Sequence, residues 1–573
     1  MNQRPWIVAD QPPISRVDEF PELPAVVVRL LWQRGYRTAT AIKQFLRPEY
    51  EQDLQDPFVF TQMQTAVDHI IAAITAQRQI TVYGDYDVDG VTATATMVEV
   101  LRALGAKVNW YLPERLAEGY GLNVRAIEEL AAQGTQFLIT VDCGSTNVAE
   151  IARANELGIS VVVLDHHHQP AEIPEAAAII NPVFEREARS FQHYSSGGVA
   201  FTVACALLQA TNNGSTLNHR VPDGWEKWLL DLTALSTVAD MMPLVGENRL
   251  LVKYGLVVLR KTRRPGLRAL FDVMGSEIET ADETTIGFQI APRLNAAGRL
   301  QHASIALELL LTRDAAQGRQ LAEQLQAINT ERQHLTEMAV DEALEQIEQQ
   351  GEQSAYTAFA PHWSPGIIGL IAGRLVERVW RPVLVMTQNG EEIVGSGRST
   401  PGYDIMSALD AGAEHFRRFG GHPGACGFTL IALDHRPTFE RWFQAHTAET
   451  VPADRTLKPV QLDLSTTLEE LDPTTIDMID VCAPYGQQNP RPVFLLSNVT
   501  IREAQVVGAK RQHVKIIVGQ GDQFGKCIGF RLGDRVAELV PGSQADLAVE
   551  VSWNIWNGRK ERQLKIIDWR TTS

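Results

Sequence analysis

The stretch Ile159-Ser160-Val161-Val162-Val163-Leu164-Asp165-His166-His167-His168 decides the fold of this chain. A continuous apolar run rich in β-branched residues is typical of a central parallel strand that is buried on both faces. Open sheets of parallel strands bind their ligands at the carboxyl ends of the strands. The sequence therefore predicts an α/β protein with potential metal ligands at the functional edge of its sheet.

Two other predicted strands end in acidic residues. Residues 80–83 lead into Gly84-Asp85-Tyr86-Asp87-Val88-Asp89-Gly90, and residues 137–141 lead into Asp142. Because parallel strands deliver their carboxyl ends to one edge of a sheet, we expect these acids and the histidines to converge. Such a cluster of carboxylates and imidazoles predicts a metal site.

The side chains of this cluster indicate which metal it binds. Carboxylate oxygens with one or two imidazoles suit Mn²⁺, or Mg²⁺ as a harder substitute, and the near absence of thiolate argues against structural zinc. Carboxylates crowded within about 4 Å repel strongly at low effective dielectric, and divalent cations would reverse the sign of that interaction. A pair of such ions suits phosphoester hydrolysis.

Each motif also has a simpler interpretation. The pattern Asp-x-Asp-x-Asp-Gly occurs in calcium loops, but here a strand precedes it and Thr96 stands where an EF-hand requires Glu. The three histidines would be a surface tract if the run before them were not a buried strand.

The three motifs, in this order and each after a strand, resemble those of the DHH phosphoesterase superfamily. Their spacing and the later modules resemble its RecJ branch, the 5′→3′ exonucleases specific for single-stranded DNA, from about residue 60 to the C-terminus. The resemblance implies an α/β fold with a doubly wound parallel-sheet DHH domain, a long helical linker, a smaller α/β DHHA1 domain and a C-terminal β-barrel of the OB type.

The resemblance also implies a site that holds two ions, Mn²⁺ or Mg²⁺. The implied metal ligands are Asp85, Asp87, Asp89, Asp142, His166 and Asp240. Some members of the superfamily have a His where this chain has Tyr83, which makes Asp85 the candidate substitute for that ligand. His167 resembles the residue that contacts the scissile phosphate, and we group Asp165 and Arg299 with it as catalytic.

Two arginine-bearing loops and two glycine-rich segments resemble parts of RecJ that hold the substrate. The implied substrate-binding residues are Arg115, Ser396, Arg398 and His422. Guanidinium groups match phosphate oxygens bidentately, so Arg115 with Ser396 and Arg398 is the candidate cluster for the 5′ end, and Arg299 for the phosphate near the metals. The alternative for the glycines is tight turns that need positive φ, and for the arginines surface ion pairs.

The chain, at 573 residues, exceeds one hydrophobic core. We expect the following parts: an N-terminal arm over residues 1–60, a DHH catalytic domain over 61–330, a linker helix over 313–350, a DHHA1 domain over 354–445, and an OB-fold nucleic-acid-binding domain over 459–573. Phe530, Trp553 and Trp556 in the last part would either stack on bases or fill the barrel core.

Composition limits the environment and the partners. The five cysteines are scattered and have no CxxC spacing, which predicts a reducing cytoplasm and no disulfide framework. No run of eighteen apolar residues appears, so we expect no contact with a membrane. The net charge of −17 argues at face value against nucleic acid. Local basic clusters such as Lys261, Arg263, Arg264 and Arg268 would nevertheless let an acidic protein bind a narrow single strand better than bulk duplex; each cluster would otherwise be solvated surface.

The leading hypothesis is a metal-dependent exonuclease that degrades single-stranded DNA 5′→3′ to mononucleotides, in DNA repair and recombination. The resemblance implies single-stranded DNA as substrate, a single-stranded-DNA-binding protein and a helicase as partners, and a monomer. One alternative is a DHH/DHHA1 phosphodiesterase acting on oligoribonucleotides or cyclic dinucleotides, or a pyrophosphatase, although the module after residue 458 has no role in those relatives. Another alternative is a non-catalytic nucleic-acid-binding scaffold, but such proteins have lost metal ligands.

Overall fold

The computed structural model describes residues 4–11, 14–115, 117–185, 191–212, 221–451, 457–556 and 559–572. The chain forms two compact units. The barrel unit contains Met1–Leu54, Pro243–Leu250 and Leu457–Ser573, and the two-sheet unit contains Gln55–Met242 and Leu251–Thr456. The chain therefore crosses between the units at residues 54–55, 242–243, 250–251 and 456–457.

The first sheet of the two-sheet unit is entirely parallel. Its strands are β2 (Gln79–Tyr83), β3 (Lys107–Tyr111), β4 (Phe137–Val141), β5 (Ser160–Leu164) and β6 (Ala178–Ile180), in the order β3-β2-β4-β5-β6. All five residues of β4 are buried, as are the last four of β5. These runs are apolar except for Thr140, as expected of strands with both faces covered.

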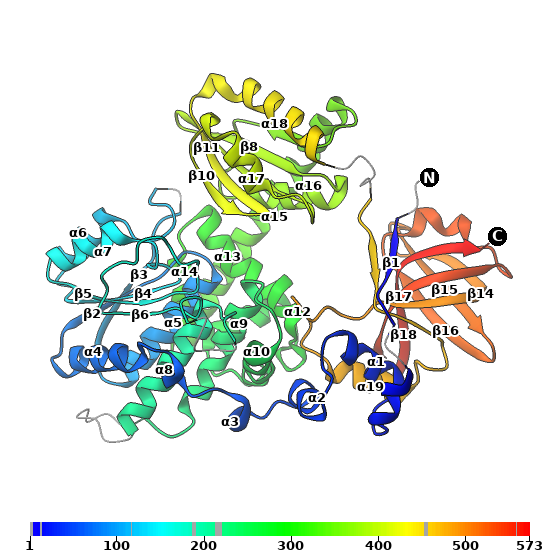
Figure 1. Cartoon of the computed structure of the whole chain (residues 1–573), viewed down its shortest axis with the longest axis horizontal. Helices are drawn as coiled ribbons and strands as arrows, with labels where there is room; N and C mark the ends of the chain where they lie inside the picture. The colour runs from blue at the N-terminus through cyan, green and yellow to red at the C-terminus, as the bar shows by residue number, and fades with distance from the viewer. Residues whose placement is uncertain are drawn as a thin grey trace. The chain divides into compact units, whose positions relative to one another are not determined.

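Helices cover this sheet on both sides. They are α4 (Met63–Thr75), α5 (Val88–Ala103), α6 (Val124–Ala132), α7 (Val148–Glu156) and α8 (Ser196–Asn212), and α9 (Leu230–Ala239) packs on α5 and α8. Figure 1 shows α6 and α7 on one face and α4 and α8 on the other. The strand order reverses between β2 and β4, and ligand sites of doubly wound sheets lie outside the strand ends at such a point.

A single long helix leads from this sheet to a second one. Helix α15 (Ala315–Gln350) has 36 residues and begins with the side chain of Asp314 accepting from the amides of Ala316 and Gln317. The second sheet has the order β10-β11-β9-β8-β7. Its strands are β7 (Tyr356–Phe359), β8 (Val383–Asn389), β9 (Glu392–Arg398), β10 (Phe416–His422) and β11 (Ala425–Leu430), with helices α16 (Ile368–Val379), α17 (Ile405–Ala411) and α18 (Arg436–Thr450).

The barrel unit is built on five strands that close on themselves. They are β14 (Phe494–Val507), β15 (His513–Gln520), β16 (Gln523–Gly529), β17 (Gln544–Trp556) and β18 (Arg559–Thr572). β14 pairs with both β15 and β17, and β16 pairs with β15 and β18, so the ring is complete when β18 pairs with β17. The expected doubly wound parallel sheet, linker helix, second α/β sheet and C-terminal barrel are confirmed.

The aromatic residues of the barrel have different surroundings. Trp553 packs against the core and donates from Nε1 to Asp477, 2.8 Å away, while the ammonium of Lys560 lies 4.3 Å from its ring centre. Phe530 is 53% exposed. The side chain of Trp556 lies outside the described residues. Phe530 is therefore the more accessible of the two described candidates for base stacking.

The N-terminal residues share the core of the barrel. Helix α1 (Ala25–Gln33) buries Val27, Leu30 and Leu31 in the same apolar cluster as Phe494 and Leu547 of the barrel strands. Strand β1 (Trp6–Val8) pairs in parallel with β12 (Val460–Leu462). The first fifty residues thus depend on the last hundred for burial of their apolar side chains.

One arginine connects three distant stretches of the barrel unit. Arg249 is 1% exposed, and its guanidinium donates to the carbonyl oxygens of Phe45, Val481, Ala483 and Pro484 at 2.7–3.3 Å. It also lies 3.9 Å from the ring centre of Phe45, and burial lowers the pKa of Arg249 to about 10. Because buried carbonyls need donors, this side chain holds Pro243–Leu250 in the barrel unit.

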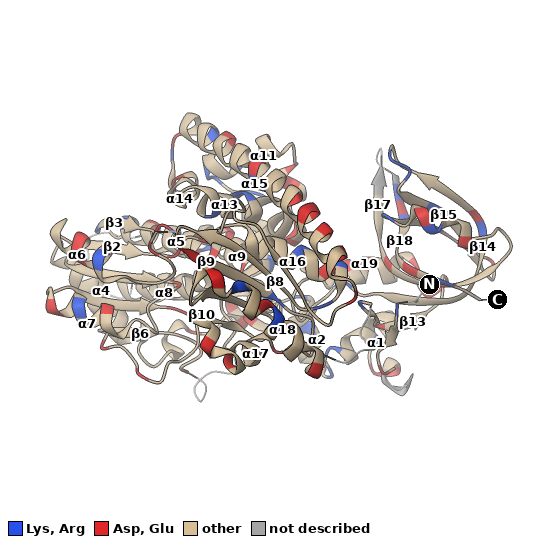
Figure 2. Ribbon diagram, turned by 90° about the horizontal axis from the view of Figure 1, so that it is seen from above, with Lys and Arg blue, Asp and Glu red and all other residues tan. Residues whose placement is uncertain are grey.

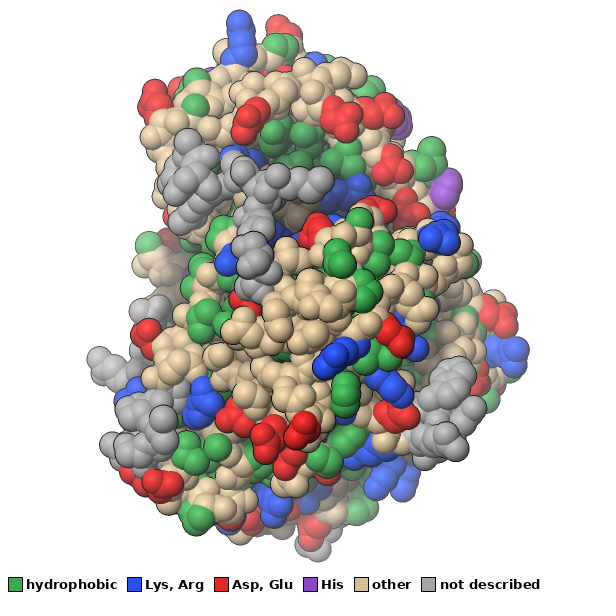
Figure 3. Space-filling model, turned by 90° about the vertical axis from the view of Figure 1, so that its right-hand side faces the viewer, with side chains coloured by type: hydrophobic (Ala, Val, Ile, Leu, Met, Phe, Trp, Pro, Cys, Tyr) green, Lys and Arg blue, Asp and Glu red, His purple; other side chains and the backbone are tan. Residues whose placement is uncertain are grey.

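Charges are mixed over the molecule. Figure 2 shows acidic and basic residues interspersed along the elements, and on the face drawn in Figure 3 Lys and Arg side chains are scattered among Asp and Glu. Net charge alone therefore describes the surface poorly. Among the described residues, no helix is both long enough and apolar enough to span a bilayer.

We predict that Arg249→Met destabilises the barrel unit by about 3–5 kcal/mol, because four buried carbonyls lose a shared charged donor. Urea unfolding followed by tryptophan fluorescence measures the loss. Arg47→Met is the matched control, since Arg47 is exposed at the end of the neighbouring helix α2 (Ala39–Leu46) and its loss should cost less than about 0.5 kcal/mol. Equal effects of the two substitutions would contradict this role of Arg249.

Candidate active site

The ends of three parallel strands bring the predicted metal ligands together. Ligand atoms within 4.8 Å of one another form three overlapping groups, which are Asp85, Asp87 and Asp142; Asp89, His166 and Asp240; and Asp142, His166 and His167. Nε2 of His166 lies 3.3 Å from Asp142 Oδ1, 3.6 Å from Asp89 Oδ2 and 3.7 Å from Asp240 Oδ2. Asp142 belongs to two groups and lies between the acids of the first motif and the histidines.

Tight backbone packing fixes the first motif. A Cβ on Gly90 would lie 2.6 Å from the backbone of Asp85, and one on Gly84 would lie 2.0 Å from Thr94 Oγ1. The side chain of Asp87 caps α5 by accepting from the amides of Asp89 and Gly90. Only glycine permits this close approach, so the start of α5 is held directly over the end of β2.

The second motif carries backbone strain. Asp142 has φ of +63°, a left-handed conformation that is uncommon for residues other than glycine. Its amide donates to the carbonyl of Leu164 at 3.0 Å, which ties it to the end of β5. Strained residues of this kind cluster at functional sites, where the surrounding structure holds them in place.

Asp89 is held by a helix terminus that lies outside the three predicted motifs. The amides of Ser196 and Gly197, at the start of α8, donate to Oδ2 and Oδ1 of Asp89 at 2.7 and 2.9 Å. Ser196 Oγ donates to Asp142 Oδ1 at 2.9 Å, and the hydroxyl of Ser236 donates to Asp89. Amides at a helix N-terminus stabilise an anion, and the run Ser195-Ser196-Gly197-Gly198 before an apolar stretch was the available signal.

The acidic residues of the cluster repel one another. Burial and the neighbouring carboxylates raise the pKa of Asp85 and Asp142 well above the usual range of an aspartate. Burial and the charge of Asp89 raise the pKa of Asp240 to about 8. Burial opposes a charge on His166, but the carboxylates of Asp89 and Asp240 outweigh it and raise its pKa. The cluster therefore needs positive charge to keep its carboxylates ionised at neutral pH.

Two orphaned oxygens show that the cluster fits a divalent cation. Oδ1 of Asp85 and Oδ2 of Asp240 are buried and accept no hydrogen bond from the described residues. Buried carboxylate oxygens without donors are costly unless a cation coordinates them. Oxygen ligands with one or two imidazoles suit Mn²⁺ or Mg²⁺.

Asp165 supports His167 and is engaged on both oxygens. Its Oδ1 lies 2.7 Å from His167 Nδ1 and accepts from the amide of His166 at 2.7 Å, and its Oδ2 accepts from the amide of Ser145 at 2.9 Å. Burial would raise the pKa of Asp165, but the hydrogen bond and charge of His167 outweigh it and lower the pKa. The carboxylate thus fixes the orientation of the His167 ring.

Tyr120 contacts the same histidine from a loop. Its hydroxyl lies 3.0 Å from Nδ1 of His167 and also donates to the carbonyl of Asp142 at 3.0 Å. The sequence pattern indicated the loop but not this residue. Gly119 and Gly121 on either side have φ of +84°, so they turn the loop sharply at Tyr120 and supplied the only local signal.

Three arginines gather beside the acidic cluster. The ring of Tyr86 lies 4.8 Å from the guanidinium carbon of Arg115. Burial, followed by the charges of Arg115 and Arg332, lowers the pKa of Arg299 to about 9. Burial and the charge of Arg115 also lower the pKa of Arg398. Guanidinium groups crowded in this way favour an anionic ligand such as phosphate.

The second sheet contributes Ser396, Arg398 and His422. Nη1 of Arg398 donates to Ser396 Oγ at 3.1 Å, and a Cβ on Gly369 would lie 3.2 Å from both side chains. His422 Nδ1 lies 3.3 Å from His168 Nε2. The structure thus places Ser396 with Arg398, and His422 against the last histidine of the metal motif.

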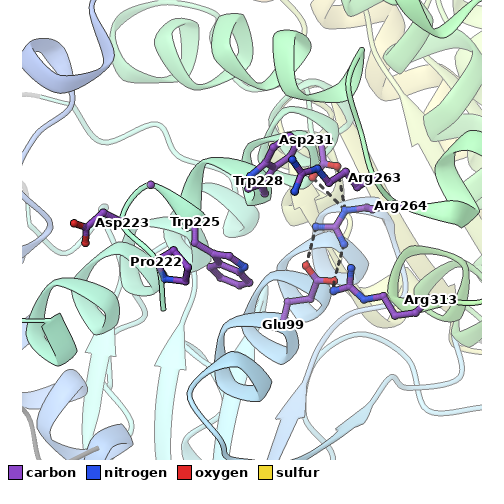
Figure 4. A pocket seen from close by; sticks show the side chains of 10 residues that line it. Glu99, Pro222, Asp223, Trp225, Trp228, Asp231, Arg263, Arg264 and Arg313 are labelled. Carbon is purple, nitrogen blue, oxygen red and sulfur yellow. Dashed lines mark hydrogen bonds and ion pairs between the residues drawn. The ribbon is translucent and has the colours of Figure 1, made fainter. Parts of the chain in front are cut away.

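The basic cluster at residues 261–268 is largely structural. Figure 4 shows Arg264 between the carboxylates of Glu99 and Asp231, at 2.8 and 3.1 Å. Arg263 lies over the ring of Trp228 at 3.9 Å. Arg264 therefore holds α5, α9 and α11 (Pro265–Met274) together, and it is not available for a nucleic acid.

Family comparisons agree with the three parts of the fold. The DHH family N-terminal domain matches residues 79–237, the DHHA1 domain matches 351–444, and the RecJ OB domain matches 462–568. Fold and site together define a DHH-class protein that carries a DHHA1 domain and an OB domain.

Whole-chain comparisons place it more narrowly. The single-stranded-DNA-specific exonuclease RecJ of Bacillus subtilis (strain 168) is 37% identical over 99% of this chain and 70% of that protein, and RecJ of Dickeya dadantii (strain 3937) is 34% identical over 96% of both. A crystal structure of RecJ from Thermus thermophilus with Mn²⁺ matches with a TM-score of 0.85 and 30% identity, over 99% of this chain and 80% of that one. A second, with Mg²⁺, has a TM-score of 0.78. The chain belongs to the RecJ family.

We predict that divalent cations stabilise the protein more as pH rises. The pKa values of Asp85, Asp142 and Asp240 are raised in the metal-free fold, so folding takes up protons and stability falls as pH rises from about 4 to about 8. Bound cations keep these carboxylates ionised and remove that loss. The difference in melting temperature between Mn²⁺ and EDTA should therefore be larger near pH 8 than near pH 5.5.

Asp240→Asn is the matched variant for this test. The amide cannot ionise, so the metal-free protein should lose part of its pH dependence between about pH 5.5 and 8. A Mn²⁺-induced shift that is the same at both pH values in the wild-type protein would contradict the electrostatic account.

We predict that His167→Ala lowers kcat by about 100- to 1000-fold, the usual effect of losing one donor to a reacting oxyanion. Asp165→Asn should lower kcat in the same direction, because the imidazole loses its charged acceptor. The Mn²⁺-induced rise in melting temperature should persist in both variants. His69→Ala on the exposed face of α4 is the control. Loss of the Mn²⁺ effect in His167→Ala would show that this histidine is a metal ligand instead.

Proposed function

We propose that this protein is a metal-dependent exonuclease that degrades single-stranded DNA from the 5′ end to mononucleotides. The observation that carries the proposal is the pair of orphaned carboxylate oxygens, on Asp85 and Asp240, within a cluster that adjoins three guanidinium groups. Such a site combines cation binding with phosphate binding. The RecJ relatives are named as single-stranded-DNA-specific exonucleases, which supports the same substrate here.

The residues of the chain have separate tasks in this reaction. Asp85, Asp87, Asp89, Asp142, His166 and Asp240 would hold two divalent cations. When bound, such ions supply an activated water nucleophile and neutralise phosphate oxygens. His167, oriented by Asp165 and Tyr120, donates to the phosphate oxygen on which charge develops. Arg299 holds the phosphate beside the acidic cluster.

A second set of residues would determine the end of the strand at which degradation begins. The cluster for the terminal phosphate would consist of two guanidinium groups and a hydroxyl, from Arg115, Arg398 and Ser396. Arg115 is near Asp85 and Asp87, since its charge lowers the pKa of both, and Arg398 donates to Ser396. A terminal phosphate carries more charge than an internal one and suits such a cluster. Binding the 5′ phosphate there sets the first phosphodiester at the cations, so the enzyme removes nucleotides from that end.

The cellular setting belongs to the same proposal. The chain would act in DNA repair and recombination in the cytoplasm as a monomer, with a single-stranded-DNA-binding protein and a helicase as partners. None of the described cysteines forms a disulfide, which supports a reducing compartment. The barrel would extend the binding track for the strand.

Two alternatives are weaker. A phosphodiesterase for cyclic dinucleotides or short oligoribonucleotides would leave the RecJ OB domain without a role. A non-catalytic scaffold would not need to retain six clustered ligands with two unsatisfied oxygens.

We predict that 5′-labelled single-stranded DNA releases labelled mononucleotide first in Mn²⁺, that EDTA abolishes release, and that blunt duplex is resistant. Arg398→Gln should raise KM for a 5′-phosphorylated strand by about 10- to 100-fold and leave a 5′-hydroxyl strand nearly unchanged, because one charged hydrogen-bond donor is lost. Arg417→Gln, an exposed residue on β10 paired with Glu392, is the matched control. Release of the 3′-terminal nucleotide first from a 3′-labelled strand, or equal digestion of single-stranded and duplex DNA, would refute the proposal.

A further inference from the structure

Two apolar side chains beside the metal cluster are unusually exposed. Phe288 is 80% exposed and Met241 is 64% exposed, the two highest values among the large apolar side chains of the described residues. Burying such a side chain usually stabilises a protein by about 1.5–3 kcal/mol. The fold does not gain that stabilisation from Phe288 or Met241. Neither residue has a part in the site described above.

Both residues lie on irregular backbone. Phe288 is the central residue of a π-helix, η5 (Ile286–Ile290), which runs directly into α13 (Ala291–Leu300). Met241 has φ of +57°, in the left-handed region that a methionine rarely adopts. Short π-helical segments and strained residues are found preferentially at functional sites. Two independent irregularities therefore present these two side chains to solvent.

The two irregular segments lie side by side and adjoin the acidic cluster. A Cβ on Gly287 would lie 3.8 Å from Val238 of α9, and Met241 directly follows the metal-ligand candidate Asp240. On the other side, α13 contacts the first motif, where Asn295 Oδ1 accepts from the amide of Val88. Met241 thus directly follows Asp240, and Phe288 lies on the segment that runs into the helix carrying Arg299; the pair is here called the apolar platform.

The position of the platform relative to the arginines gives the direction of the strand. The guanidinium carbon of Arg115 lies 4.8 Å from the ring centre of Tyr86, which stands between Asp85 and Asp87 in the sequence, and these two acids belong to one group of potential ligands. Asp240, which Met241 directly follows, belongs to another group, with Asp89 and His166. The arginine cluster and the platform therefore adjoin different groups of potential ligands. A strand with its 5′ phosphate on the arginines would continue toward Asp240, and its next nucleotide would reach the platform.

The chemistry of the platform fits a nucleobase better than a protein. Specific protein interfaces bury about 1,200–2,000 Å², far more than two side chains provide. A base needs only one ring and one flexible neighbour, and methionine sulfur packs favourably against aromatic edges. Every base has a π-face, so such stacking tolerates any sequence but requires a base that is not already stacked in a duplex.

We propose that Phe288 and Met241 form a subsite for the unpaired nucleobase immediately 3′ to the scissile phosphate. The inference rests on the proposed exonuclease function and adds a residue-level account of strand selection. A base on the platform fixes the scissile phosphate at the cations, and a paired base cannot occupy it without leaving its stack.

A protein-by-substrate cycle tests the subsite. The substrate is a 5′-phosphorylated, 5′-labelled single strand, intact or with an abasic residue at the second nucleotide, and the readout is single-turnover release of the first nucleotide. Phe288→Ala should slow release from the intact strand by about 5- to 150-fold, the range that base–aromatic stacking supports. The abasic residue should slow the wild-type enzyme similarly but should not slow Phe288→Ala further, because both changes remove one interaction.

Three controls make the result decisive. Phe288→Trp should restore the rate and the abasic penalty, and Met241→Ala should show a smaller coupling of the same sign. Leu157→Ala, an exposed position at the end of α7, should match the wild-type enzyme. Phe288→Ala should keep its melting temperature and its response to Mn²⁺, which separates the subsite from folding and from the metal centre.

The failures of the two proposals are distinguishable. A wild-type protein that releases no nucleotide from the intact strand in Mn²⁺ overturns the exonuclease itself. An active wild-type protein whose abasic penalty persists undiminished in Phe288→Ala overturns the subsite alone. Loss of the Mn²⁺ response in Phe288→Ala also overturns it, because the residue would then support the metal cluster.

Discussion

The repulsion between buried carboxylates is the constraint on which the rest of the two-sheet unit depends. Asp142 belongs to one group with Asp85 and Asp87 and to another with two histidines. Burial and the neighbouring carboxylates raise the pKa of Asp85, Asp142 and Asp240. The fold compensates in part, by aiming the amides of α8 at Asp89 and by placing His166 among the acids. Cations complete the compensation, so metal affinity and fold stability are linked at this one site.

Substrate recognition depends on residues that surround the same acidic cluster. His167 is fixed by Asp165 and Tyr120, and burial with the charge of Arg115 lowers the pKa of Arg299 and of Arg398 nearby. Positive charge is therefore local, within a protein whose net charge is −17. The guanidinium groups beside the cluster can therefore bind phosphate although the protein as a whole is acidic.

The sequence predicted those parts of the site that follow a strand directly. Asp85, Asp142 and His166 each stand within two residues of a strand end, so a local pattern and parallel topology were sufficient. Tyr120 and Ser196 were missed because tertiary packing alone brings them to the cluster. The sequence could not distinguish a carboxylate that faces a cation from one that orients an imidazole, which is the arrangement found for Asp165. It also contained no sign that Pro243–Leu250 belongs with the barrel, since Arg249 is held there by backbone carbonyls that carry no sequence signature.

The shared core of α1 and the barrel has a consequence for biosynthesis. Leu30 and Leu31 leave the ribosome early, but Phe494 and Leu547, with which they share a core, follow more than 450 residues later. At about 5–20 residues per second, the apolar face of α1 waits roughly 20–90 s for its partners. The two-sheet unit can fold during that interval, whereas the barrel unit closes only after its last strands have been made. Helix α1 is thus a natural client of chaperones that shield apolar segments at the ribosome.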